Sequence, residues 1–158
     1  GIGCVLTEKE VKAICKAFDY PLIEFNNEII RTIAVPVLGR IPAGFPMQIP
    51  EDHIIEYLYL PEQEAGTLAL LVSGDSMFPT LQDGNFVLFK RDTAVLDNDI
   101  VVVTTAEGGE GMVKRYRQSD NGAVTLVPDN PNYPTFEPNG FRIIGRVTEV
   151  VTVKRFRR

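Results

Sequence analysis

Short apolar runs separated by turn-forming pairs constrain the fold of this chain more than any other feature of its sequence. From Thr32 onward, segments rich in Val, Ile, Leu, Phe and Tyr alternate with pairs such as Asp83-Gly84 and Asn121-Gly122. Such pairs favour tight turns between strands, because Gly and Asn adopt a positive φ at little cost. With few helical stretches between the runs, the pattern predicts a mainly β fold, either an antiparallel barrel or a sandwich-like sheet.

The predicted strands share a short length and an enrichment in β-branched and aromatic residues. They are residues 33–41, 54–60, 68–72, 85–89, 100–104, 112–116, 124–127 and 142–153. Pro36 in the first segment has no N–H to donate, so we do not expect this segment in the centre of a sheet.

The N-terminal stretch has a helical pattern instead. Thr7 and Glu10 form a capping box, in which each side chain bonds the backbone N–H of the other residue. Apolar residues then follow at the spacing of one helical face, namely Val11, Ile14, Cys15 and Phe18. Pro21 disfavours helical geometry at the residue before it, so it ends the predicted helix.

A second helical turn is predicted at Leu22 to Phe25, which makes residues 1–31 a helical segment. About thirty residues cannot bury much of a core alone. This segment is therefore either the remnant of another domain or an element that packs on a second domain, residues 32–158.

The charge balance limits the partners of the chain itself. Its 158 residues include 16 Lys or Arg and 21 Asp or Glu, a net charge of −5. A domain that binds nucleic acid through its surface is normally basic, so we do not expect this chain alone to bind nucleic acid strongly. We interpret the basic residues within 154–158 as a solvated tail, with a phosphate contact as the alternative. No apolar run reaches the roughly 18 residues of a membrane span and no secretory signal opens the chain, so we expect a cytoplasmic protein without a membrane partner.

The rare residue types exclude several kinds of site. Cys4 and Cys15 form no C-x-x-C pair, and His53 is the only histidine. A structural zinc site therefore lacks ligands, and no G-x-S-x-G motif accompanies His53 to suggest a Ser-His-Asp triad. Glycine motifs that bind phosphates or dinucleotides are also missing. We expect no metal and no cofactor, and we interpret Cys15 as a buried thiol in a reducing compartment and His53 as a surface residue.

Two positions depart from this ordinary pattern. Ser76 follows directly after a predicted strand, where Pro79 fixes a short turn and nearby backbone N–H groups can stabilise an oxyanion. The alternative is an ordinary serine in a capped turn. Lys114 lies in a predicted strand, on the same face as the apolar Met112 and Tyr116. Burial there lowers a lysine pKa and yields a neutral amine that accepts a proton, whereas the alternative is a surface lysine with an extended stem.

Taken together, these segments resemble a known family. Gly74-Asp75-Ser76-Met77-x-Pro79-Thr80, followed downstream by Val113-Lys114-Arg115, is similar to the motifs of the LexA and phage-repressor family of self-cleaving Ser-Lys peptidases, which includes UmuD. The resemblance covers roughly Val35 to Val153. Other segments that agree with it are residues 83–84, 99–102 and 144–147.

The resemblance implies a LexA-type antiparallel β-barrel or sheet with the residues of a peptidase. Ser76 is then the nucleophile and Lys114 the general base, and the backbone N–H groups of Ser76 and Met77 are expected to form the oxyanion hole. Residues 35–46 resemble the cleavage segment of the family, V-x-G-x-x-A-A-G-x-P, which implies a scissile bond between Ala43 and Gly44. Pro42 stands where the family often has Ala, which puts the ease of docking of this segment in doubt.

The resemblance also implies partners. We expect a homodimer, and cleavage that a RecA–single-stranded-DNA filament or another inducing factor promotes. Residues 11–25 are similar to the last helices of phage-repressor helix-turn-helix domains. Operator DNA is therefore expected to bind only through an N-terminal domain that is largely absent from this chain.

The resulting interpretation is the C-terminal regulatory domain of a LexA-like or phage-type transcriptional repressor that self-cleavage inactivates. A UmuD-like self-processing accessory protein of translesion DNA synthesis is the first alternative. A signal-peptidase relative shares the serine and lysine patterns, but it requires a membrane anchor and has no internal cleavage segment. The remaining alternative is a β-rich partner-binding domain without catalysis.

Overall fold

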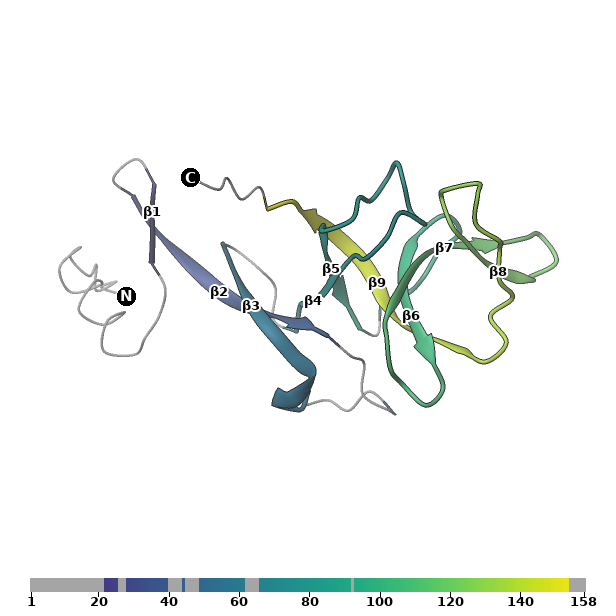
Figure 1. Ribbon diagram of the computed structural model, residues 1–158, viewed down its shortest axis with the longest axis horizontal. Coiled ribbons are helices and arrows are strands. Elements are labelled where there is room, and N and C mark those ends of the chain that lie inside the picture. Colours follow the sequence, from purple (N-terminus) through teal and green to yellow (C-terminus); the bar gives the residue numbers. More distant parts are fainter. Residues whose placement is uncertain are drawn as a thin grey trace, which may run out of the picture.

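The computed structural model describes residues 22–25, 28–39, 44, 49–61, 66–91 and 93–153 (Figure 1). Within these residues the chain is mainly β, as predicted, and every predicted strand is present, as β2 to β9. The strands are β1 (Leu22–Phe25), β2 (Glu28–Leu38), β3 (Ile54–Pro61), β4 (Leu68–Leu71), β5 (Phe86–Lys90), β6 (Ile100–Thr105), β7 (Met112–Gln118), β8 (Val124–Val127) and β9 (Phe141–Val151). A single 3-10 turn, η1 (Glu51–His53), is the only helical element of the described ranges.

The N-terminal part of the described chain differs from the sequence-based expectation. Leu22–Phe25 was expected to form a helical turn but forms β1, which pairs antiparallel with the start of β2. A lone helical turn leaves most of its backbone groups unpaired, whereas a hairpin pairs them with a second strand. β2 also begins at Glu28 and so crosses the expected boundary between residues 31 and 32. The predicted helix that ends before Pro21 lies outside the described residues.

One sheet contains all nine strands. Their order is β1-β2-β4-β5-β9-β6-β7-β8, with β3 paired to β2 off this path. The pairs are antiparallel except for β2 and β4, which run parallel over Val37–Leu38 and Ala69–Leu70. β2 has β3 on one side and β4 on the other, so the expectation that the segment with Pro36 avoids the centre of the sheet is wrong. Within the described strands, Pro36 itself pairs only with β3 and comes directly before the two residues that also pair with β4, so its missing N–H costs no hydrogen bond to β4.

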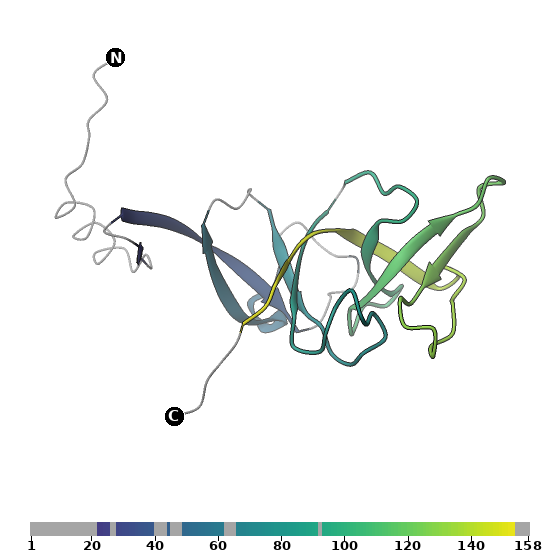
Figure 2. The same cartoon turned by 90° about the horizontal axis from the view of Figure 1, so that it is seen from above.

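β9 joins the two parts of the sheet, because it pairs with β5 and also with β6. Figure 2 shows this strand, in yellow, running along the body of the molecule. Gly145 lies in the stretch where β9 passes between its partners, and a Cβ atom there would come within 2.3 Å of the Lys90 carbonyl oxygen. Only glycine allows the two backbones to approach so closely.

The two faces of the strands bury separate apolar clusters. The largest includes Phe89 of β5, Val113 of β7 and two residues between β4 and β5, Met77 and Leu81. A second cluster includes Tyr116 of β7 together with Val101, Val103 and Leu126. β7 therefore contributes alternate side chains to two cores, as the period of a strand requires. No helix of the described residues is long and apolar enough to cross a membrane.

Candidate active site

The chain between β4 and β5 forms a tight loop that presents Ser76. Gly74 has a φ of 83° and its N–H donates to the Asp83 carboxylate at 2.7 Å, which closes the loop across its base. Met77 is 2% exposed within the main apolar cluster, so it anchors the loop from below. Ser76, directly before it, is half-buried. The loop therefore holds a serine hydroxyl at the edge of the core.

Lys114 extends from β7 to this serine. Its Nζ lies 3.1 Å from Ser76 Oγ and 3.1 Å from the Val113 carbonyl oxygen, to which it donates. The residue is only 6% exposed, so the alternative of a surface lysine is wrong. Nζ also lies 6.0 Å from the centre of the Phe136 ring. Phe136 packs in the same cluster as Met112 and Tyr116, which confirms the predicted face of β7.

The surroundings of Lys114 favour the neutral amine. Burial removes the ammonium from water and lowers the pKa of Lys114 below its ordinary value of 10.5. Among the described residues, no carboxylate forms an ion pair with Lys114 that would raise its pKa again. A neutral amine at hydrogen-bond distance from a hydroxyl can accept the hydroxyl proton.

The backbone beside Ser76 offers donors for a negatively charged oxygen. Within the part of the chain that the structure describes, no acceptor is bound to the backbone N–H of Ser76 or of Met77. The next N–H along the chain, that of Phe78, donates to the Asp75 carbonyl oxygen at 3.0 Å. The predicted oxyanion hole thus has two unoccupied donors, and its role stays a prediction.

A loop after β8 holds the Ser76 loop from the other side. Asn130 is 6% exposed, and its backbone N–H donates to the Ser76 carbonyl oxygen at 3.0 Å. Its side-chain Nδ2 donates to the Asp75 carbonyl oxygen at 3.0 Å. Tyr133 donates its hydroxyl proton to the Asp75 carboxylate. The Asp129-Asn130-Pro131 sequence is typical of any turn, so it gave no signal of these contacts.

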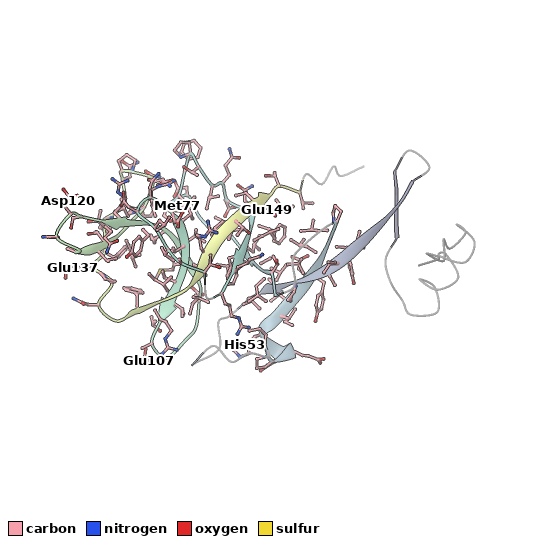
Figure 3. The ribbon with its side chains drawn as sticks, turned by 180° about the vertical axis from the view of Figure 1, so that it is seen from behind. His53, Met77, Glu107, Asp120, Glu137 and Glu149 are labelled. Atoms are coloured by element: carbon pink, nitrogen blue, oxygen red, sulfur yellow. The ribbon has the colours of Figure 1, made fainter. Side chains whose placement is uncertain are left out.

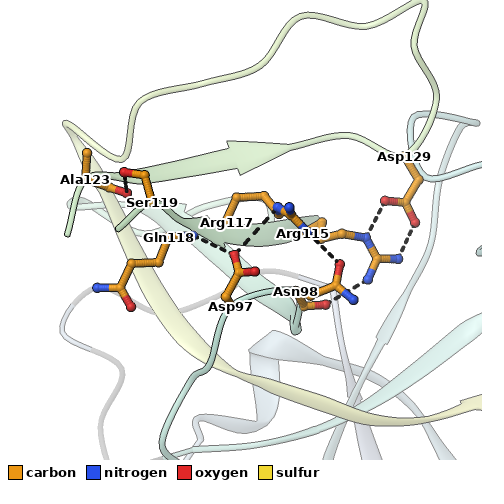
Figure 4. A network of polar contacts seen from close by, with 8 residues as sticks. All are labelled: Asp97, Asn98, Arg115, Arg117, Gln118, Ser119, Ala123 and Asp129. Carbon is orange, nitrogen blue, oxygen red and sulfur yellow. Dashed lines mark hydrogen bonds and ion pairs between the residues drawn. The ribbon is translucent and has the colours of Figure 1, made fainter. Parts of the chain in front are cut away.

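Arg115, the neighbour of Lys114, fixes the start of this loop. Its Nε and Nη2 donate to the two oxygens of Asp129 at 2.6 and 2.5 Å, and its Nη1 donates to the Asn98 carbonyl oxygen at 2.8 Å (Figure 4). The guanidinium lowers the pKa of the Asp129 carboxyl below its ordinary value, chiefly through these hydrogen bonds. The bidentate pair therefore connects the strand of Lys114 to the loop that holds Ser76.

The predicted cleavage segment is described only in part. Ala43 lies outside the described residues, while Gly44 is exposed with a φ of 70°. The first residues of the segment, Val35 to Leu38, form the end of β2, and Ser76 follows β4, the parallel neighbour of β2. Parallel strands have their carboxyl ends at the same edge of a sheet, so β2 and β4 end at the same edge. The Ala43–Gly44 bond stays a prediction.

His53 is separate from this site. It lies in η1 before β3, is half-buried, and its carbonyl oxygen accepts from the Gly39 N–H at 2.9 Å. Figure 3 shows His53 well apart from Met77, the neighbour of Ser76. The only histidine of the sequence therefore takes no part in the Ser76 site, and Cys4 and Cys15 lie outside the described residues.

Comparison with known proteins agrees with this geometry. The profile of the family described as Peptidase S24-like matches residues 36–148, a range that contains both Ser76 and Lys114. The chain belongs to the Peptidase S24-like family. This membership confirms the resemblance to the self-cleaving Ser-Lys peptidases and makes the chain a relative of serine peptidases.

Several relatives of this S24-like chain are LexA repressors. It is 36% identical over 129 residues to the LexA repressor of Bifidobacterium adolescentis, an alignment that covers 79% of this chain and 49% of the relative. For the LexA repressor of Magnetococcus marinus the identity is 34% over 133 residues, covering 81% and 56%. For that of a Parafrankia species it is 40% over 121 residues, covering 74% and 47%. The chain thus spans about half the length of these relatives.

Proposed function

We propose that this chain is the regulatory part of a LexA-like repressor, and that it cuts its own Ala43–Gly44 bond with Ser76 and Lys114. The observation that carries the proposal is the 3.1 Å distance between Ser76 Oγ and the buried Lys114 Nζ, which forms no ion pair with a carboxylate of the described residues. A lysine with a lowered pKa is the general base that a serine nucleophile needs in the absence of a histidine. The S24-like family membership and the LexA repressor relatives support the same function.

The reaction follows from the positions of these groups. Lys114 Nζ accepts the hydroxyl proton while Ser76 Oγ attacks the Ala43 carbonyl carbon, and the resulting oxyanion accepts hydrogen bonds from the N–H groups of Ser76 and Met77. The Lys114 ammonium then gives its proton to the Gly44 nitrogen, and the C–N bond breaks. Residues 1–43 remain as an ester on Ser76.

Hydrolysis of this ester completes the cut. Lys114, neutral again, accepts a proton from a water molecule whose oxygen attacks the Ala43 carbonyl carbon. The ester bond breaks, the Lys114 ammonium gives its proton to Ser76 Oγ, and Ala43 becomes a free carboxylic acid, which releases its proton to the solvent. Ser76 and Lys114 therefore return to their initial states, and the net reaction is the hydrolysis of one peptide bond by one water molecule.

Cleavage by this route would release the repressor from DNA. We propose that the cytoplasmic protein acts as a homodimer whose operator-binding domain precedes this part of the chain. Two linked DNA-binding domains bind far more tightly than one, so cutting the connection to a dimerising body lowers operator affinity. A RecA–single-stranded-DNA filament, or another inducing factor, would act by favouring the cleavable arrangement of the segment around Ala43.

The test is to incubate the purified chain at about pH 10 and to measure the masses of the products by mass spectrometry. At this pH the neutral fraction of a lysine with a lowered pKa is larger than at pH 7, so we expect two fragments, residues 1–43 and 44–158. Ser76→Ala and Lys114→Ala should remain whole. Ser73→Ala, which changes an exposed serine of the same loop, should cleave like the wild type. A wild-type chain that stays intact, or a cut elsewhere, would refute the proposal.

A further inference from the structure

Asn130 is a buried polar residue that the proposed reaction does not use directly. It makes two hydrogen bonds to consecutive carbonyl groups of the nucleophile loop. Its Nδ2 donates to the Asp75 carbonyl oxygen, and its backbone N–H donates to the Ser76 carbonyl oxygen, both at 3.0 Å. One residue thus holds both peptide units that flank Ser76.

Because the peptide bond is planar, these two contacts also fix the directions of the Ser76 and Met77 N–H groups. In a planar trans peptide, the N–H points opposite to the C=O of the same unit. The Asp75 carbonyl faces Asn130, so the Ser76 N–H points away from Asn130. The Ser76 carbonyl also faces Asn130, so the Met77 N–H points away as well. Asn130 thereby directs the two unoccupied donors of the predicted oxyanion hole.

The side chain of Asn130 is itself held in one orientation. Its Oδ1 accepts from the Asn132 backbone N–H at 3.1 Å, which places the amide nitrogen toward Asp75. Only a side chain with an acceptor and a donor on the same carbon satisfies both contacts. The preceding residue, Asp129, is fixed by Arg115 of β7. The orientation of the Ser76 loop is therefore tied to the strand that carries Lys114.

We propose that Asn130 is a positioning residue for oxyanion stabilisation, which sets the direction of the Ser76 and Met77 N–H groups without touching the scissile bond. This inference rests on the proposed self-cleavage. Preorganised donors stabilise an oxyanion because they need no reorientation as the charge develops. Without the Asn130 amide, the Phe78 N–H is the one backbone donor of the described residues that the Asp75 carbonyl keeps, and its peptide unit gains freedom to rotate.

The experiment compares first-order cleavage rates of the wild type, Asn130→Ala and Asn132→Ala between about pH 7 and pH 11. Asn132→Ala is the matched control, because it removes an exposed amide from the same loop and keeps the backbone N–H that Asn130 accepts from. Removing an oxyanion donor outright lowers a rate by about 10²–10³-fold. In Asn130→Ala both donors remain, and the backbone N–H of residue 130 still holds the Ser76 carbonyl, but the Ser76 N–H loses the side-chain contact that orients its peptide unit. The cleavage rate should rise with pH and level off once Lys114 is neutral. We expect Asn130→Ala to lower this plateau rate about tenfold or more. The pH at which the rate reaches half of its plateau (the pH midpoint) should not change, since Lys114 stays buried.

A second variant covers the case in which Asn130→Ala fails to fold. Asn130→Asp keeps the size of the side chain and the acceptor for Asn132, but replaces the donor with a carboxylate that repels the Asp75 carbonyl oxygen. It should lower the plateau rate at least as much as alanine does. Circular dichroism of each variant identifies the folded proteins before the rates are compared.

The outcomes separate this inference from the function on which it rests. If Asn130→Ala and Asn130→Asp cleave as fast as Asn132→Ala while the wild type cleaves normally, the positioning role is refuted and self-cleavage stands. A fall in rate with the pH midpoint moved upward would place the effect on Lys114 and also overturn the inference. A wild-type chain that never cleaves refutes the proposed function together with the inference.

Discussion

Burial of Lys114 has two opposite consequences, one for its proposed role as a base and one for the stability of the folded chain. Its burial gives the amine a lowered pKa, which suits a general base. The same burial penalises the ammonium form, which predominates in the unfolded chain at neutral pH. Since the pKa of the folded state lies below that of the unfolded state, the unfolded chain binds more protons over the interval between them. Stability from this group therefore rises with pH across that interval, up to about pH 10.5.

Lys114→Met should make the protein more stable at neutral pH. Methionine fills a similar volume against Phe136 without a charge to desolvate, so we expect the melting temperature at pH 7 to rise by about 2–4 °C, the shift that corresponds to roughly 1 kcal/mol in a domain of this size. The gain should shrink as the pH rises through 10.5, because the wild-type amine is neutral in both states only above that value. Thermal unfolding followed by circular dichroism at the two pH values measures this difference. A variant less stable than the wild type at pH 7 would contradict it.

At the level of single residues, the sequence indicates the proposed catalytic pair better than the residues that hold it. Ser76 and Lys114 are singled out by the motifs that resemble the self-cleaving Ser-Lys peptidases, because a hydroxyl after a strand and a lysine on an apolar face each have an ordinary structural explanation. Asn130 does not stand out, because an asparagine between aspartate and proline is ordinary turn chemistry. Its contacts depend on the packing of two loops that are 55 positions apart in the chain.

β7 carries two arginines on its less buried face, and their surroundings differ. Arg115 makes a bidentate pair with Asp129, with side chains that are 21% and 11% exposed. Arg117 makes a single ion pair with Asp97 at 3.6 Å, with side chains that are 51% and 47% exposed. Water screens the second pair far more than the first. The two arginines thus form a matched comparison on one strand.

Arg115→Met should destabilise the protein by about 1–3 kcal/mol, because it leaves the largely buried Asp129 carboxylate without its main partner. Arg117→Met should cost less than about 1 kcal/mol. The pKa of Asp129 is lowered in the folded state, so its contribution is present above the ordinary carboxyl pKa and is lost as the pH falls through the folded value. The free energies of unfolding of the wild type and of Arg115→Met should therefore become more similar below about pH 4. Urea unfolding at pH 7 and pH 3 measures these free energies. Equal losses of stability for Arg115→Met and Arg117→Met would contradict the prediction.

The sequence predicts most strands but not how they pair. β3 to β8 follow from runs of apolar and β-branched residues between turn pairs, which are local signals. β1 escaped prediction because its four residues suit a helical turn as well as a strand, and only its pairing with β2 decides between them. The parallel contact of β2 with β4 and the double pairing of β9 join distant segments, for which no local pattern exists.

For the whole molecule, this topology bears on whether the chain cuts itself or a neighbour. β2 contains the start of the predicted cleavage segment and β4 precedes the Ser76 loop, and the two strands are hydrogen-bonded in parallel. The strands that lead to Gly44 and to Ser76 are therefore adjacent in one sheet of one chain and end at the same edge. A tethered bond of this kind has an effective concentration far above that of a second molecule, up to about 10⁵ M or more when the geometry is right.

Self-cleavage should consequently follow first-order kinetics, with a rate constant that is unchanged over a hundredfold dilution at fixed pH. The expected result comes from the tether, because dilution separates molecules but leaves Ser76 and Gly44 on one chain. Intact-mass measurement of the remaining full-length chain at each concentration gives the rate constants. As a second measurement, Ser76→Ala with an added mass tag is mixed with excess wild type and should stay whole while the wild type is cut. A rate that falls in proportion to concentration, or rapid cutting of the tagged variant, would mean that the serine of one chain reaches the segment of another, and the parallel β2–β4 contact would then not explain the reaction.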